Sequence, residues 1–124
     1  MPRRKSIWKL FSPTAPMARW PGSRRLPSDA AIRAALANVH YHVAYIGWLV
    51  RTRDWLAGDR MSYADLAAAA HLSSVDYLGD VPWNEDEAAK AWYARVKSRP
   101  SFRPLLIEMH AGIPPSKTYA DLDF

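Results

Sequence analysis

Apolar residues recur at alternating steps of four and three from Ser28 to about Arg53. This spacing is typical of one face of an amphipathic helix, and Ser28 is a favourable N-cap with Asp29 in the first turn. Gly47 lies inside the stretch, where it either permits close approach of another segment or weakens the helix locally. The pattern predicts one long helix with an apolar stripe. The stripe consists of Ile32, Leu36, Val39, Val43, Ile46 and Val50.

A second helix is predicted from Ser62 to about Tyr77, because three helix-start signals coincide there. Ser62 is the predicted N-cap, and the Asp65 side chain can accept a hydrogen bond from the Ser62 backbone N–H, which completes a capping box. Met61 and Leu66 occupy the hydrophobic-staple positions beside this box. Four alanines follow, and their small side chains allow other elements to cross closely. We therefore expect a central, buried helix.

Two shorter helices are predicted in the second half of the chain. Gly79 and Pro82 break the chain after the central helix, and the run from Asn84 to Glu87 is a second predicted capping box for a helix ending near Ser98. Ser101 is predicted to cap a short last helix. The four predicted helices make the fold class all-α. Residues expected to face the core of the last two are Ala88, Ala91, Trp92, Val96, Leu105, Leu106 and Met109.

The first 27 residues differ in composition from the rest of the chain. They contain five of the ten prolines and seven of the 17 basic residues, and no acidic residue. Prolines at this spacing exclude a helix or a central strand, so residues 1–27 are predicted to form a disordered basic tail. Residues 28–110 form the predicted helical domain, and residues 111–124 are predicted to be a C-terminal tail.

The formal net charge of +5 does not indicate nucleic-acid binding, because of where the charge lies. From Ser28 onward 12 acidic residues outnumber ten basic ones, so the helical part is mildly negative. The absence of cysteine excludes disulfides and thiolate chemistry and fits a reducing, cytoplasmic location. No apolar run is long enough to span a bilayer, so no membrane is expected as a partner.

Residue types that often carry chemistry are not arranged for it in this chain. No two of the four histidines are spaced to share a metal ion, and none has an acidic neighbour one helical turn away. Asp76 and Asp80 are four residues apart but straddle a predicted helix end, where a solvated pair is expected. We therefore predict no catalytic, cofactor-binding or metal-ligating residue. The histidines are His40, His42, His71 and His110.

Three segments together resemble the C-terminal half of the glutathione S-transferases. They are Trp55-Leu56-Ala57-Gly58-Asp59-Arg60, the helix start Met61-Ser62-Tyr63-Ala64-Asp65-Leu66, and Trp92 followed by Arg99-Pro100-Ser101-Phe102-Arg103-Pro104. The resemblance spans Ser28 to about Leu106 and implies the helical bundle that forms the second domain of that family. It does not extend to the thioredoxin-like domain, which carries the glutathione site and the thiol-activating residue in those enzymes.

Two functions follow from this resemblance. The first is a shortened, transferase-like protein that is not catalytic alone and acts in protein interaction. The alternative is a glutathione transferase that conjugates glutathione to electrophiles when the missing domain is supplied. Glutathione is expected as a cofactor only in the second case.

The second half of the chain also resembles the division-associated, glutathione-transferase-like proteins of alphaproteobacteria, which bind the tubulin-like division protein. The segments that carry this resemblance are residues 76–83, 97–100 and 119–124. It implies a division protein as partner. The acidic and aromatic end of the chain is either a docking peptide or a tail packed on its own domain. Its candidate docking residues are Tyr119, Asp121, Leu122, Asp123 and Phe124.

Aromatic residues off the stripe of the first helix are a further candidate site. Tyr41, Tyr45 and Trp48 are either core residues or part of an apolar pocket or interface. In the resembled family, other elements cover this helix. We therefore expect some of the four side chains Tyr41, Tyr45, Trp48 and Leu49 to remain exposed here as an apolar patch. Such a patch favours a symmetric homodimer through this helix.

Overall fold

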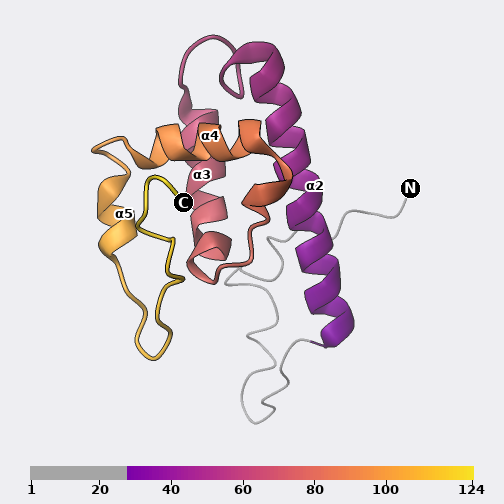
Figure 1. Cartoon of the computed structure of the whole chain (residues 1–124), viewed down its shortest axis with the longest axis vertical. Coiled ribbons are helices and arrows are strands. Elements are labelled where there is room, and N and C mark those ends of the chain that lie inside the picture. Colours follow the sequence, from indigo (N-terminus) through magenta and orange to yellow (C-terminus); the bar gives the residue numbers. More distant parts are fainter. Residues whose placement is uncertain (1–27) are drawn as a thin grey trace. The chain divides into compact units, whose positions relative to one another are not determined.

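The computed structural model describes residues 28–124, and the helices there follow the predicted order (Figure 1). They are α2 (Asp29–Arg53), α3 (Tyr63–Tyr77), the short 3₁₀ helix η2 (Trp83–Glu85), α4 (Glu87–Lys97) and α5 (Arg103–Ile107). Within these residues the only β pairing is an isolated bridge between His110 and Ile113. The predicted all-α class is therefore confirmed. The predicted disorder of residues 1–27 lies outside the described residues.

The chain divides into two units, residues 1–41 and 42–124. The described part of the first unit is the N-terminal half of α2, which begins as predicted. The backbone N–H of Ala31 donates to Ser28 Oγ over 3.2 Å, so Ser28 caps the helix. Val39 is buried, whereas Ile32 is 44% exposed. The predicted stripe is therefore not buried along its whole length.

In the second unit, the C-terminal half of α2 contributes four buried side chains, Val43, Ile46, Leu49 and Val50. The helix ends at Arg53. The next residue, Asp54, has a φ of 70° in the left-handed region, and its N–H still donates to Val50 O over 3.0 Å. Helix α3 is the central element of this unit, because most of its residues are wholly or partly buried. Among its 15 residues only Tyr63, Ala64, His71 and Ser74 are exposed.

Helix α4 begins later than the sequence predicted. Residues Trp83–Glu85 form a 3₁₀ turn that buries Trp83, and the N-cap is Asp86 rather than Asn84. Both residue types cap helices well, and burial of the indole decides between them. Ala88 is only half-buried and Ala91 is exposed, contrary to prediction. The buried residues of α4 are Ala89, Trp92, Tyr93, Val96 and Lys97.

Helix α5 also differs from its prediction, in its N-cap and in one core residue. Its N-cap position is Phe102, which makes no side-chain capping bond, so Ser101 is not the cap. Leu106 is buried and Leu105 is half-buried, but Met109 is 76% exposed. Met109 lies beyond the last helical residue, so the helical period no longer sets its direction.

The C-terminal segment returns across α3 and α4 instead of leading away from them (Figure 1). Ser116 N–H donates to the Tyr77 carbonyl over 2.8 Å, and the Tyr77 hydroxyl donates to Ile113 O over 2.6 Å. The Tyr119 hydroxyl donates to Leu105 O over 3.2 Å. The end of the chain therefore packs on its own domain, and docking by the residues of this segment that stay exposed remains a prediction.

Asp86 also joins α4 to α2. Its carboxylate accepts the Ala89 N–H over 3.0 Å and two hydrogen bonds from Arg51 Nη1, of 3.0 and 3.2 Å. The same carboxylate lies against the backbone of Gly47, where a Cβ atom would overlap it. Gly47 therefore serves close approach rather than local weakening of the helix.

Gly47→Ala is expected to lower the free energy of unfolding by about 1–2 kcal/mol, because the overlap with Asp86 outweighs the better helix propensity of alanine. Gly58→Ala is the matched control, since no heavy atom lies within 4 Å of a Cβ at that position. Chemical denaturation of both variants tests this. A Gly47→Ala variant more stable than the parent would contradict the close approach.

Candidate interaction site

The aromatic face of α2 is turned outward. Tyr41, in the first unit, is 54% exposed. In the second unit Tyr45 and Trp48 are 51% and 52% exposed, and their spacing of three residues places them on one side of the helix. The Tyr45 and Trp48 rings stack with centroids 6.0 Å apart. Leu49, also considered for this patch, is buried. None of the three aromatic side chains is thus part of the core, and Tyr45 with Trp48 forms the exposed aromatic face of α2 in the second unit.

The side chain of Asp65 forms hydrogen bonds with three elements. Its Oδ2 atom accepts the Ser62 N–H over 2.9 Å, and Ser62 Oγ in turn accepts the Ala64 N–H over 3.3 Å. Its Oδ1 atom accepts the Leu56 N–H over 3.0 Å and Trp92 Nε1–H over 2.8 Å. Met61 and Leu66, the predicted staple residues, are both half-buried. Asp65 is fully buried, so it ties the loop before α3, the start of α3 and α4 together.

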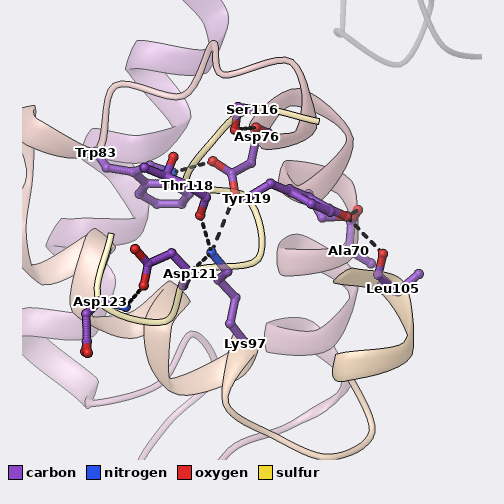
Figure 2. Close-up of polar contacts among 11 residues, drawn as sticks. Ala70, Asp76, Trp83, Lys97, Leu105, Ser116, Thr118, Tyr119, Asp121 and Asp123 are labelled. Atoms are coloured by element: carbon purple, nitrogen blue, oxygen red, sulfur yellow. Dashed lines mark hydrogen bonds and ion pairs between the residues drawn. The ribbon is translucent and has the colours of Figure 1, made fainter. Parts of the chain in front are cut away.

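Lys97 is the residue that sequence reasoning missed. It lies in the last turn of α4, and it is fully buried. Its ammonium group donates to Asp121 O over 2.7 Å and to Thr118 O over 3.4 Å (Figure 2). The aliphatic part of a lysine is compatible with burial, but its charge requires partners. The C-terminal segment supplies two of those partners through its backbone.

Asp76 supplies the opposite charge, and the solvated pair predicted for Asp76 and Asp80 is wrong. Asp80 is exposed, whereas Asp76 is 3% exposed and its Oδ2 lies 3.9 Å from Lys97 Nζ. Trp83 Nε1–H donates to Asp76 Oδ1 over 2.9 Å, as Figure 2 shows. The chain turns back at Gly79, whose φ of 79° ends α3, and this brings Trp83 over Asp76.

Burial dominates the electrostatics of this pair. It raises the pKa of Asp76, and the Trp83 hydrogen bond and the charge of Lys97 oppose that rise. It lowers the pKa of Lys97, against the charges of Asp76 and Asp121. Burial, and then the charge of Asp76, raise the pKa of Tyr93 well above its ordinary value. Among the described residues, the buried side-chain atoms without a hydrogen bond are Asp76 Oδ2 and the Tyr93 hydroxyl oxygen.

Aromatic rings close the space around the Lys97 ammonium group. Nζ lies 4.2 Å from the centroid of the Phe124 ring and 5.2 Å from that of Tyr93. Tyr93 stacks on Trp83 at 4.4 Å, and Phe124 meets Trp83 edge to face at 5.6 Å. Cation–π attraction is strongest where water is excluded, so these rings stabilise the charge in place. Asp76, Trp83, Tyr93, Lys97 and Phe124 are called the Lys97 cluster below.

The candidate docking residues at the end of the chain divide into two groups. Tyr119 is buried and Phe124 is half-buried, so these two are anchors. Asp121, Leu122 and Asp123 are exposed, and the Asp123 N–H donates to Asp121 Oδ1 over 2.9 Å. The outward part of the segment is therefore a short turn with two acidic side chains and one leucine.

The described residues contain no group of three or more histidine, cysteine or acidic side chains that could hold a metal ion. They also contain no helix both long and apolar enough to cross a membrane. The Lys97 cluster is closed by rings and backbone, an arrangement that suits holding a segment in place rather than contact with a substrate. Two surfaces of the described residues are therefore candidates for binding. They are the α2 aromatic face and the turn formed by Asp121, Leu122 and Asp123, which we call the acidic turn.

The geometry defines an all-helical domain whose central helix is capped and buried. Residues 31–100 match the family described as "Glutathione S-transferase, C-terminal domain", and the chain belongs to that family. It is 55% identical over 98 residues to FtsZ-localized protein A of Caulobacter vibrioides, a match that covers 79% of this chain and 43% of that protein.

Two solved structures agree with this assignment. A glutathione S-transferase from Rhodospirillum rubrum F11 is similar with a TM-score of 0.77 and 58% identity, over 82% of this chain and 46% of that one. FzlA from C. crescentus is similar with a TM-score of 0.77 and 54% identity, over 81% of this chain and 44% of that one. The chain therefore spans less than half the length of each of these relatives.

Proposed function

We propose that this chain is a binding module of bacterial cell division in the cytoplasm, whose partner is the tubulin-like division protein. The similarity to a protein named for its localisation with FtsZ supports the partner. The acidic turn supports a binding role, since its anchors Tyr119 and Phe124 are buried and half-buried while Asp121, Leu122 and Asp123 are exposed. A fixed turn loses less conformational freedom on binding than a free tail would.

Co-sedimentation with polymerised tubulin-like division protein tests this function. The parent chain is expected to pellet with the polymer, and Asp121→Lys with Asp123→Lys is expected to weaken binding at least tenfold by reversing the charge of the turn. Asp59→Lys is the control, because it reverses an exposed acid elsewhere. Equal binding by all three proteins would remove the acidic turn from the interface, and no binding by the parent would refute the partner.

A second candidate function is glutathione conjugation, which the similarity to a glutathione S-transferase structure favours. The chain matches the C-terminal domain of that family. We infer that conjugation requires the part of the relatives that this chain does not cover. The purified chain is therefore expected to give no glutathione-dependent turnover of a chromogenic aryl halide. Turnover that survives repeated purification would make the isolated chain an enzyme.

We also propose that the exposed α2 aromatic face forms a homodimer. Tyr45 and Trp48 are each about half exposed and stack on one another, and adjacent aromatic side chains at a surface favour association. Sedimentation velocity at micromolar concentration is expected to show a dimer, and Trp48→Glu is expected to shift it at least tenfold toward monomer. Leu78→Glu is the control at another exposed apolar residue. A parent protein that sediments only as a monomer would refute the dimer.

A further inference from the structure

We propose that Lys97 is a positioning residue, which fixes residues 116–124 in one conformation and so presents the acidic turn to a partner. This deepens the proposed binding function and rests on it for the role of the turn. The structural part of the proposal stands separately. It rests on a cation buried in the domain whose hydrogen bonds go to the backbone of the segment.

The hydrogen-bond pattern shows why one side chain can order the whole segment. Residues 116–121 form two successive turns, with Tyr119 N–H donating to Ser116 O and Asp121 N–H donating to Thr118 O, each over 3.1 Å. The Lys97 ammonium group contacts the carbonyls of Thr118 and Asp121, at the two ends of the second turn. It thereby sets both the place and the direction in which the chain leaves that turn.

Anchors on either side of Lys97 restrict the segment further. Ser116 Oγ donates to Asp76 O over 3.0 Å, which holds the start of the segment to the end of α3 (Figure 2). The Phe124 ring lies over Lys97 Nζ at 4.2 Å and over Lys90 Nζ at 5.4 Å. The segment is thus held at both ends, and the acidic turn projects between these anchors.

Because burying a charge is costly, Lys97 and the C-terminal segment depend on each other for their positions. A lysine ammonium group without water requires hydrogen-bond acceptors, and the described structure gives it two carbonyls of the segment and the more distant carboxylate of Asp76. If the segment lifts away, Lys97 loses both hydrogen bonds and the Phe124 ring. The packed position of residues 116–124 and the burial of Lys97 therefore depend on each other.

Lysine acylation measures this coupling without changing Lys97. In the parent protein, Lys97 is expected to react with acetic anhydride at least tenfold more slowly than the exposed Lys117. Phe124→Ala removes the ring over Nζ and is expected to raise the rate at Lys97 at least fivefold, with the rate at Lys117 unchanged. A Lys97 rate that remains low in Phe124→Ala and in Tyr119→Ala would overturn the coupling.

Hydrogen exchange and partner binding complete the test. Lys97→Met is expected to reduce protection of amides 119–123 at least tenfold relative to amides of α3, and Phe124→Ala is expected to act in the same direction if Lys97→Met fails to fold. Both variants are expected to lose affinity for polymerised tubulin-like division protein although Asp121 and Asp123 remain. If exchange changes but the parent protein does not bind, the proposed function fails and the positioning role stands. Unchanged exchange would refute the positioning role.

Discussion

Asp65→Ala is expected to lower the free energy of unfolding by about 4 kcal/mol, several times the effect of losing the helix cap alone. The substitution leaves the N–H groups of Leu56, Ser62 and Trp92 without their acceptor. The bond from Trp92 is buried, and the other two are partly buried. Unpaired buried donors cost about 1–3 kcal/mol each, although such costs do not add fully. The loss approaches the whole stability of a small domain.

Two variants separate the contribution of the helix cap to stability from that of the Asp65 hydrogen bonds with Leu56 and Trp92. Ser62→Ala removes only the capping hydroxyl, so about 1 kcal/mol is expected. Asp65→Asn keeps one acceptor oxygen and should fall between Ser62→Ala and Asp65→Ala. Urea denaturation monitored by far-UV circular dichroism gives all three values. If Ser62→Ala and Asp65→Ala unfold at the same urea concentration, the bonds to Leu56 and Trp92 contribute nothing and the capping box is the only role of Asp65.

The contrast between these two residues shows how far a sequence can predict this fold. The bond from Ser62 to Asp65 joins residues three apart, and a local pattern of residue types predicts it. The bond from Trp92 to the same carboxylate joins residues 27 apart, and no spacing indicates it. Helix existence and most helix limits were therefore predictable, because they depend on neighbours in the chain.

Errors in the predicted core have a different physical cause. Periodicity predicts which face of a helix is apolar, but not where a neighbouring element stops covering it, so Ile32 is exposed and Val39 is buried. At the start of α4, two suitable caps lie two residues apart, and the burial of Trp83 selects Asp86. The buried face of α4 keeps the predicted Trp92 and Val96 but includes Lys97, and a charged side chain gives the apolar pattern no sign of its burial.

The candidate site was predictable in part. The outward direction of Tyr45 and Trp48 followed from their place off the apolar stripe. The end of the chain had two equally admissible interpretations, because acidic and aromatic residues suit both docking and packing. The structure shows the packing, which includes two hydrogen bonds from Lys97, and a lysine in the last turn of a helix gives no local sign of burial. Only the position of residues 118 and 121 in space reveals it.

Lys97→Met is expected to lower the free energy of unfolding by about 3–5 kcal/mol, because it leaves Asp76 buried without its counter-charge. The double variant Lys97→Met with Asp76→Asn should lose less than the sum of the single losses, since no isolated charge then remains. Lys117→Met is the control at an exposed lysine and should be close to neutral. Additive losses in the double variant would exclude a direct coupling of the two charges.

The free energy of unfolding of Lys97→Met is expected to depend on pH in a definite direction. Burial raises the pKa of Asp76 above its ordinary value, and loss of Lys97 removes one of the influences that lower it. A carboxyl group with a raised pKa in the folded state binds protons better there than in the unfolded chain, so stability increases as the pH falls through that pKa. The deficit of Lys97→Met should therefore shrink in acid relative to that of the double variant with Asp76→Asn. Parallel curves of unfolding free energy against pH for these two variants would show that Asp76 is not the buried charge that Lys97 neutralises.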